Sequence, residues 1–251
     1  MDVLLLAFAL LGAVMGSFVG VIAERAYTGQ SFVTGRSRCN SCARALEPLD
    51  LVPVFSWLLA RGRCRTCGSR VPAAYLVLEA SLALLFALSY AVLGLSLVLP
   101  VFLALLVVVA FIVVYDLRHT IVPPPSSLTL AALALAYALL RAPSEGALGG
   151  ALLAAGLISA FFLALHVFSG GRAMGLGDAP VAFSLALIAA PHALSGLLFS
   201  FWIGALYGIA VLVLRRGGPR MGIEVPFVPF MALGFLLAYF TGWDPLSFAL
   251  Y

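Results

Sequence analysis

The sequence predicts an all-α polytopic membrane protein of about eight transmembrane helices, with a small zinc-ribbon-like insertion between the first two helices. Of its 251 residues, 64% are hydrophobic and 10% are charged, and the mean hydropathy is +1.16. A soluble domain cannot bury that much apolar surface, so the lipid bilayer is an expected partner. The net charge is +4, but arginines gather on the cytoplasmic side of membrane proteins, so no nucleic-acid partner is expected.

Length places the spans, because helices that are apolar all round carry no clear face. The expected spans are residues 3–23, 74–94, 98–115, 126–141, 147–168, 179–193, 195–214 and 225–241. The first run lacks the basic start and the cleavage site of a signal peptide, so it is expected to be retained. Helix breaks are predicted at Pro123-Pro124-Pro125 and in the glycine-rich segment 170–177. The predicted division is therefore a first transmembrane helix (1–23), a cysteine box (24–73) and a seven-helix membrane domain (74–251).

Orientation follows from the basic residues, which are all arginines. Eight of the 14 lie in the cysteine box, and with eight spans five more fall on the same side. Only Arg141 falls on the other side. The predicted orientation has a periplasmic N-terminus and a cytoplasmic cysteine box. The five further arginines are Arg118, Arg172, Arg215, Arg216 and Arg220.

Two aspartates stand beside apolar runs, where charge is costly and therefore suggests function. Asp116 follows the third predicted span and Asp178 precedes the sixth, so both are expected at the cytoplasmic face. Two neighbouring carboxyl groups can activate a water molecule, one as base and one as acid. Structural alternatives are an interfacial pair of Asp116 with Arg118, and a helix N-cap for Asp178.

Two further features of the sequence also suggest function. Gly175 and Gly177, just before Asp178, would let the backbone approach a substrate, or would simply break a helix. Glu79 lies inside the second predicted span and requires a partner, either an arginine or the lining of a cavity.

The cysteine box holds all four cysteines, as Cys39-Asn40-Ser41-Cys42 and Cys64-Arg65-Thr66-Cys67. Each C-x-x-C turn can direct two thiolates at one ion, and two turns complete a tetrahedral zinc site. Flanking arginines would offset the negative charge of four thiolates. The principal interpretation is a structural zinc site. A redox relay and a pair of disulfides are the alternatives, the latter disfavoured by the reducing cytoplasm.

The ordered motifs resemble those of the bacterial type IV prepilin peptidases, the prepilin-like leader peptidase/N-methyltransferases. The resemblance covers nearly the whole chain. Its motifs are Gly16-Ser17-Phe18-Val19, the cysteine box with Leu49-Asp50-Leu51-Val52-Pro53, Asp116-Leu117-Arg118-His119 with Pro123, Gly175-Leu176-Gly177-Asp178, and Pro226-Phe227-Val228-Pro229-Phe230.

This resemblance implies an aspartic endopeptidase of the inner membrane, with Asp116 and Asp178 as the catalytic pair. It would cut the basic leader from prepilins and pseudopilins after a glycine, on the cytoplasmic side. It would also N-methylate the new terminal residue from S-adenosylmethionine. Three positions depart from the family pattern: Ala179-Pro180-Val181 where a lysine is usual, Pro124 where an acid is usual, and Gly20 where an asparagine is common.

Several other functions remain possible at this point. One is a prepilin-type peptidase without methyltransferase activity, and another is a different two-aspartate intramembrane protease. An ion-coupled transporter would use Asp116 and Asp178 to bind a cation, although no internal repeat is found. A membrane thiol oxidoreductase would use both cysteine pairs.

Overall fold

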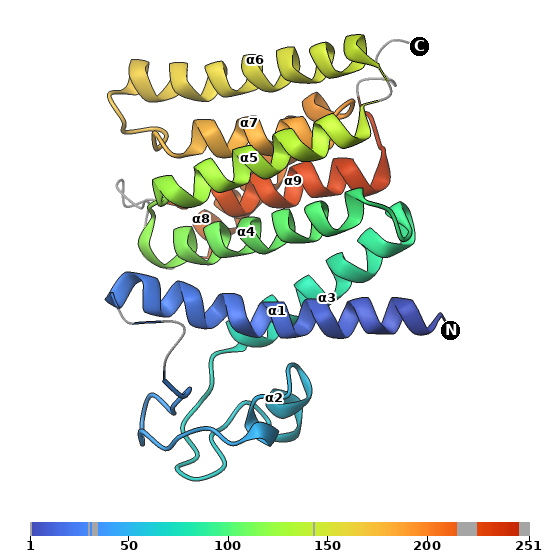
Figure 1. Ribbon diagram of the computed structural model, residues 1–251. Helices are drawn as coiled ribbons and strands as arrows, with labels where there is room; N and C mark the ends of the chain where they lie inside the picture. Colours follow the sequence, from blue (N-terminus) through green and yellow to red (C-terminus); the bar gives the residue numbers. More distant parts are fainter. Residues whose placement is uncertain (1, 30, 32–34, 143, 215–224, 246–251) are drawn as a thin grey trace. The chain divides into compact units, whose positions relative to one another are not determined.

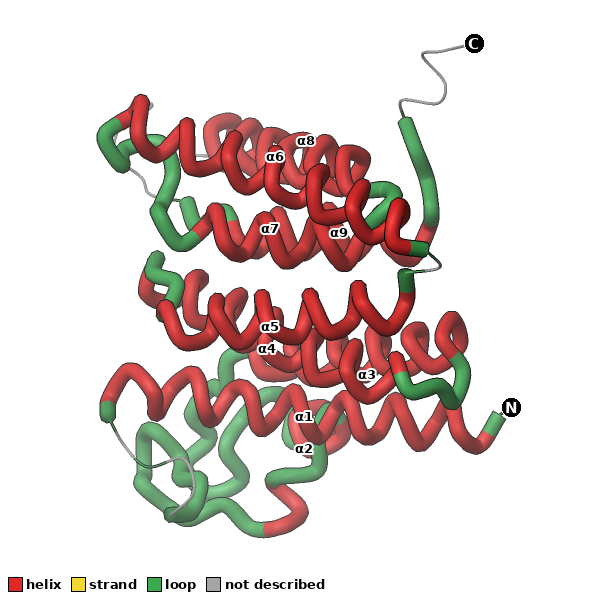
Figure 2. Tube along the Cα trace, turned by 45° about the horizontal axis from the view of Figure 1, so that its top comes forward, coloured by secondary structure: helices red, strands yellow, loops and turns green. Residues whose placement is uncertain are grey.

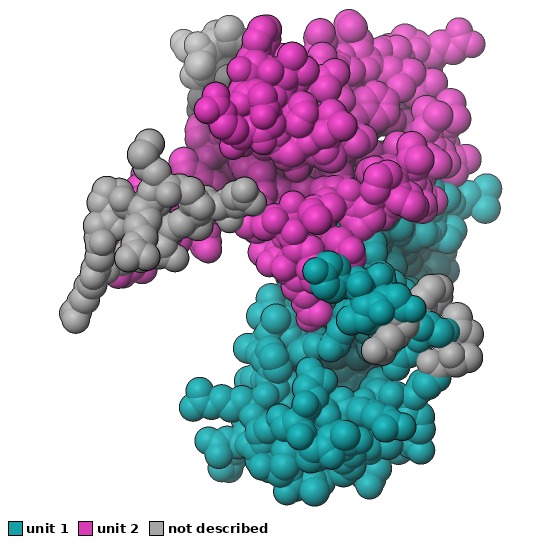
Figure 3. Space-filling model, turned by 90° about the vertical axis from the view of Figure 1, so that its left-hand side faces the viewer, with its two compact units in different colours: residues 1–114 teal, residues 115–251 magenta. Residues whose placement is uncertain are grey.

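The computed structural model describes residues 2–29, 31, 35–142, 144–214 and 225–245. These residues form helices joined by loops, with two isolated β-bridges in the cysteine box (Figure 2). The chain divides into two compact units, residues 1–114 and 115–251 (Figure 3). Arg215, Arg216 and Arg220, which contribute to the predicted orientation, lie outside the described residues.

Unit 1 contains the helices on either side of the cysteine box. They are α1 (Val3–Thr28), the short helices η1 (Pro48–Asp50) and α2 (Phe55–Leu59), α3 (Ala73–Leu93), and most of α4 (Val98–His119). Helices α1 and α3 pack against each other (Figure 1). Gly12 and Gly16, four residues apart on α1, face the α3 backbone, and a Cβ at Gly16 would stand 2.7 Å from the Cα of Glu79. Small residues at this spacing let the two helices approach closely.

Unit 2 contains the last turn of α4 and five further helices: α5 (Pro124–Arg141), α6 (Glu145–Ser169), α7 (Asp178–Ala189), α8 (Ala193–Leu214) and α9 (Val228–Thr241). Helix α7 packs against the other four (Figure 1). Ten of its 12 residues are buried, and most of them are alanine, valine, leucine or isoleucine. A helix enclosed in this way is covered by its neighbours, which explains why it is short yet apolar.

The helices agree with the eight predicted spans in position and order. The predicted span 98–115 placed Asp116 just after the helix. Helix α4 instead continues to His119, so Asp116 lies within its last turn. Five helices, α1, α3, α4, α6 and α8, are long and apolar enough to cross a membrane. The protein is therefore a multi-pass membrane protein. Helices α7 and α9 are shorter apolar helices, so the number of crossings and the domain boundaries stay predictions.

The predicted helix breaks are confirmed at both positions. Helix α4 stops at His119, and α5 starts at Pro124 with proline in its first turn, where a missing N–H group costs no helical hydrogen bond. Helix α6 ends at Ser169, and the glycine-rich segment 170–177 connects it to α7. Both breaks immediately adjoin the two aspartates.

Candidate functional site

Asp116 connects the end of one helix to the start of another. Its side chain is buried, with the residue only 5% exposed, and its Oδ2 accepts a hydrogen bond of 3.3 Å from the Val228 N–H group. Val228 is the first residue of α9, where backbone N–H groups lack partners within the helix. A helix N-terminus also attracts negative charge. The end of α4 and the start of α9 therefore meet at this carboxylate.

Asp178 is the first residue of α7 and is 7% exposed. Its Oδ2 accepts a hydrogen bond of 2.9 Å from the Gly175 N–H group, so the carboxylate folds back over the preceding loop. The N-cap of α7 is Gly177, without a side-chain cap, so the capping alternative for Asp178 is wrong. The carboxylate instead fixes the Gly175–Asp178 turn.

The segments that carry the two aspartates lie against each other. A Cβ at Gly177 would stand 2.7 Å from the Cβ of Val122, so the loop after α4 and the loop before α7 touch where only a glycine fits. The Asp116 and Asp178 side chains are close enough to act on each other electrostatically. The structure thus brings Asp116, Asp178, Gly175 and Gly177 together at one end of unit 2.

His166 of α6 also contributes to this region, although from the sequence alone it was interpreted as a packing or interfacial residue. Its Nδ1 lies 2.9 Å from the Met174 carbonyl oxygen, and because a carbonyl only accepts, Nδ1 carries the proton. His166 therefore connects α6 to the loop that ends in Asp178. A histidine within an apolar helix, nine residues before Gly175, was the available signal.

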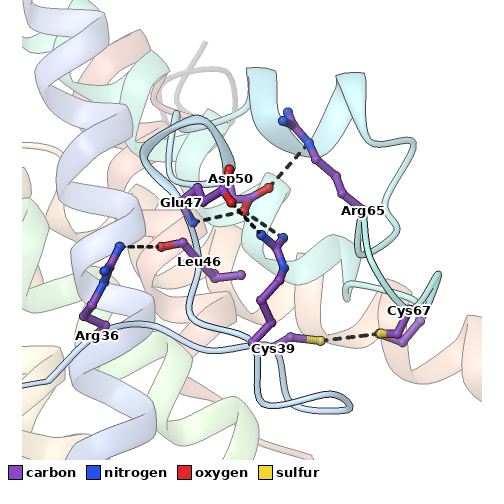
Figure 4. Close-up of polar contacts among 9 residues, drawn as sticks. Arg36, Cys39, Leu46, Glu47, Asp50, Arg65 and Cys67 are labelled. Carbon is purple, nitrogen blue, oxygen red and sulfur yellow. Dashed lines mark hydrogen bonds and ion pairs between the residues drawn. The ribbon is translucent and has the colours of Figure 1, made fainter.

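In unit 1 the four cysteines come together as the spacing predicts. Their sulfur atoms all lie within 4.8 Å of one another, and Cys39 Sγ is 3.9 Å from Cys67 Sγ (Figure 4). Tetrahedral zinc with Zn–S bonds of about 2.3 Å would separate its sulfurs by about 3.8 Å. The four cysteines can therefore hold one metal ion.

The two cysteine turns share one backbone pattern. The N–H group of Cys39 bonds the carbonyl of Arg44, and that of Cys64 bonds the carbonyl of Ser69. Isolated bridges join Arg38 to Ala45 and Arg63 to Arg70, at the same offset in each turn. Two matching turns of this kind are what a four-thiolate site requires.

Backbone N–H groups of the two turns change the pKa values of the cysteine thiols. Backbone N–H groups of Cys42 and Ser41 lower the pKa of Cys39 to about 6. Backbone N–H groups of Cys67 and Thr66 likewise lower the pKa of Cys64. The N–H group of Arg44 likewise lowers the pKa of Cys42, but burial and the neighbouring thiols outweigh it and raise the pKa of Cys42 to about 11. Cysteine binds a metal ion as the thiolate, so a proton held by any of these thiols would leave when the ion binds.

Asp50 ties the two halves of the cysteine box together. Its Oδ2 accepts from Arg44 at 2.8 Å and from the Glu47 N–H group at 3.0 Å, while its Oδ1 lies 3.4 Å from Arg65 (Figure 4). The Glu47 N–H group and these two guanidinium groups lower the pKa of Asp50. Arg44 precedes the loop to the second cysteine turn, and Arg65 lies within that turn, so the one carboxylate bridges both.

Glu79 finds its partner in the backbone. Its Oε2 accepts a hydrogen bond of 2.7 Å from the Val54 N–H group, and the residue is 8% exposed. Val54 has a φ of +62°, which is unfavourable for a β-branched residue. The buried carboxylate therefore holds a strained turn of the cysteine box onto α3, and Glu79 also lines a cavity.

Comparison with known proteins gives the family. Residues 10–93 match the family model described as the bacterial peptidase A24 N-terminal domain. Proteins named prepilin leader peptidase/N-methyltransferase are similar over most of this chain. The one from Bacillus subtilis is 33% identical, over 94% of each chain. The one from Myxococcus xanthus is 36% identical over 84% of this chain and 64% of its own length. The one from Dichelobacter nodosus is 30% identical, over 82% and 71%.

No solved structure matches. The relatives share their name, and the similarity to the Bacillus subtilis protein extends over 94% of each chain. No finding favours the transporter alternative. The chain therefore belongs to the prepilin leader peptidase/N-methyltransferase family.

Proposed function

We propose that this protein is a membrane aspartic endopeptidase that removes the basic leader from prepilins and pseudopilins after a glycine. The same protein then N-methylates the new terminal residue with S-adenosylmethionine. The observation that carries the peptidase is the pairing of Asp116 and Asp178 at one end of unit 2. Both are buried, both are positioned by a backbone N–H group, and they act on each other's charge.

The proposed chemistry needs one proton shared between the two carboxyl groups. Nearby carboxylates disfavour double ionisation, so one proton on the pair is the expected state. The ionised group takes a proton from water, whose oxygen bonds to the scissile carbonyl carbon, while the other group protonates the carbonyl oxygen. A proton then passes to the amide nitrogen as the C–N bond breaks, which leaves a carboxylic acid and an amine.

Substrate access would follow from the loops around the pair. The Gly175–Gly177 loop and the segment after α4 meet at Gly177 and Val122, near both carboxyl groups. A prepilin, itself an apolar helix with a short basic leader, would present its leader at this end of unit 2. We propose that this end faces the cytoplasm and that the membrane is the inner membrane, as the arginine distribution predicts.

The four cysteines are proposed to hold Zn²⁺ as a structural ion. Cys39, Cys42, Cys64 and Cys67 would be the ligands, and Ser69, whose Oγ lies 3.1 Å from Cys67 Sγ, would support them. The ion would close a loop-rich segment that is too small to build its own core. Removal of the metal by a chelator is expected to unfold the cysteine box and to abolish methylation.

The methyltransferase part rests on the names of the relatives and on their similarity over residues 10–93 as well as the whole chain. S-adenosylmethionine supplies a methyl group to the amine that cleavage exposes. The amine nitrogen bonds to the methyl carbon as the carbon–sulfur bond breaks, sulfur keeps the electron pair, and the product ammonium loses a proton to solvent.

Mass measurement of a cleaved prepilin tests both activities. Purified protein in lipid or detergent is expected to release the leader, and to add one methyl group only when S-adenosylmethionine is present. Glu145→Gln, at an exposed acid in the first turn of α6, is the matched control for acid-to-amide changes elsewhere. An intact prepilin after incubation with folded protein in lipid or detergent would overturn the peptidase assignment.

A further inference from the structure

Helix α2 lies beside the first turns of α3, as two hydrogen bonds show. The Val54 N–H group, just before α2, donates to Glu79, which lies six residues after Ala73, the first residue of α3. The Trp57 indole donates from Nε1 at 3.2 Å to the Val71 carbonyl, just before α3. Six residues of α-helix measure about 9 Å. The start of α2 therefore lies beside the second turn of α3, and Trp57 lies beside its beginning.

These positions place α2 at the edge of a membrane span. Helix α3 is long and apolar enough to cross a membrane. Its 21 residues measure about 31 Å, and the hydrocarbon core of a bilayer is about 30 Å thick, so the whole helix is needed to cross. The bond to Glu79 therefore holds the start of α2 below the membrane surface. Trp57 lies at the surface, where tryptophan is enriched in membrane proteins.

Helix α2 exposes apolar side chains at this depth. Phe55, Leu58 and Leu59 are 57%, 52% and 77% exposed. Interfacial helices bury such side chains about 5–10 Å into the boundary between headgroups and acyl chains. A segment beside lipid must also satisfy its backbone polar groups internally. Several N–H groups of the segment 52–62 donate to carbonyl oxygens of the same segment, namely those of Ser56, Leu58, Ala60 and Gly62.

A cleft of about 370 Å³ opens where α2 and α3 meet. Its lining includes Trp57 and three exposed arginines, Arg61, Arg63 and Arg70, and none of its lining residues, all within the described part of the chain, is acidic. A Cβ at Gly62 would stand 2.7 Å from the Trp57 ring, so the turn that carries Arg61 and Arg63 packs on this ring. Trp57 thus connects the apolar helix to a basic cleft.

Two of these arginines are direct neighbours across the second cysteine turn. Arg63 and Arg70 are opposite partners in an isolated antiparallel bridge, and like charges directly opposite each other destabilise such a pair. The equivalent bridge of the first turn joins Arg38 to Ala45, so the turn itself does not require two arginines. A phosphate group between the two guanidinium groups would remove the repulsion and accept paired hydrogen bonds from them.

We propose that α2 inserts into the membrane interface beside α3, and that the cleft next to it binds the phosphate of an anionic phospholipid headgroup. Phe55, Leu58 and Leu59 contact acyl chains, and the three arginines contact the headgroup. Apolar side chains at depth and arginines at the surface follow the order of hydrocarbon and headgroups across one leaflet. A soluble anion would account for the arginines but not for the exposed apolar side chains. Neither cleavage nor methylation is needed for this interaction.

Photocrosslinking of the full chain in phospholipid vesicles tests the insertion of α2. Benzoylphenylalanine in place of Leu59 is expected to form adducts with phospholipid, which mass spectrometry identifies. The same residue in place of Leu84, 60% exposed on α3, is the positive control. In place of Asn40, an exposed residue of the first cysteine turn, it is the negative control. If position 84 forms lipid adducts and position 59 forms no more than position 40, α2 is not inserted and the proposal is wrong.

Native mass spectrometry of the purified full chain in mixed micelles tests the headgroup site. Phosphatidylglycerol is expected to bind more tightly than phosphatidylcholine, and each arginine removed should weaken its binding about fivefold. Arg61→Gln should therefore cost about fivefold, and Arg63→Gln combined with Arg70→Gln about 25-fold. Arg38→Gln, at the equivalent position of the first cysteine turn, carries the same charge change and should have little effect.

A competition with inorganic phosphate separates a lipid from a soluble anion. Phosphatidylglycerol should remain bound in millimolar phosphate at matched ionic strength. Its displacement by phosphate alone would identify a site for a soluble anion and overturn the proposal. Equal phosphatidylglycerol binding by wild type and by the variants at Arg61, Arg63 and Arg70 would also overturn it. Metal content and the apparent unfolding temperature show that the compared variants are folded.

Discussion

Asp116, in the last turn of α4, accepts a hydrogen bond of 3.3 Å from the backbone N–H group of Val228, the first residue of α9. The two residues are 112 positions apart in the sequence. The bond gives a role to the Pro226–Phe230 motif, which spans the start of α9. The first residue of the helix presents its N–H group to a buried carboxylate. In our account, this contact positions one member of the catalytic pair.

Removal of that N–H group should slow cleavage without unfolding the protein. Replacement of Val228 by its α-hydroxy analogue converts the amide to an ester and leaves the side chain in place. We expect a roughly tenfold lower kcat, because the Asp116 carboxylate loses the hydrogen bond from the Val228 N–H group. Val228→Ala, which keeps the N–H group, is the control. Equal kcat for the ester and for wild type would show that the contact does not position Asp116.

Gly177 is expected to tolerate no side chain. Its φ of −67° suits alanine, so Gly177→Ala would act only through the clash of its Cβ with Val122, 2.7 Å away. A displacement of the loop by about 1 Å should lower cleavage up to about 100-fold. The double variant Gly177→Ala with Val122→Gly should recover much of the rate. Gly146→Ala on α6, where nothing lies within 4 Å, is the control.

If the double variant cleaves no faster than Gly177→Ala alone, steric pressure between the two loops is not the cause. Initial rates at saturating substrate make this comparison, since the account predicts a change in kcat and not in KM.

His166 should act as a positioning residue for the Asp178 loop. His166→Phe keeps the bulk but removes the Nδ1–H donor to the Met174 carbonyl, and we expect about tenfold slower cleavage. His166→Gln, whose amide can donate to the same carbonyl, should restore part of the rate. Hydrogen exchange of the amides between Met174 and Asp178 gives a second readout. Faster exchange in the phenylalanine variant and not in the glutamine variant is expected.

Asp50 should stabilise the cysteine box in a pH-dependent way. Its pKa in the folded protein lies below the 3.8 of a free aspartate, so its stabilisation is present above about pH 4 and is lost as the pH falls through the lower value. Asp50→Asn is expected to cost about 1–3 kcal/mol at pH 7 and progressively less below pH 4. Apparent unfolding temperatures of the two proteins across this range measure the difference.

Glu47→Gln is the control for that prediction. The Glu47 side chain is 68% exposed and lies 3.6 Å from Arg44, and such surface pairs contribute little. A difference between wild type and Asp50→Asn that stays constant from pH 7 to pH 3 would contradict the assigned role.

The sequence predicted most of the fold, because the spans are set by long apolar runs and their ends by proline and glycine. It placed the end of α4 too early, because the apolar run ends at Tyr115 and Asp116 was expected at the cytoplasmic face. The carboxylate is instead buried by contact with α9, which no local pattern reveals. Helix α7 was predicted as a longer span because burial among four neighbouring helices leaves no mark on a uniformly apolar sequence.

In the candidate sites, too, the sequence predicted the local features but not the contacts between distant residues. Cysteine spacing predicted the metal centre, because the geometry of a C-x-x-C turn is local. The partners of the acids were not predictable: Val228 and Val54 contribute backbone N–H groups, which carry no side-chain signature. Glu79 was expected to need an arginine or a cavity, and it lines a cavity while binding a strained backbone turn. His166 was interpreted as a packing or interfacial residue, because a histidine in an apolar helix does not show which group it will bind.

A double-mutant cycle on the two aspartates tests the central claim most directly. Cleavage rates of a prepilin are compared for wild type, Asp116→Asn, Asp178→Asn and the double variant. If the two carboxyl groups share one proton and act as a unit, each single variant should fall to the same residual rate as the double variant. Partial losses that multiply in the double variant, or full activity in either single variant, would contradict the account.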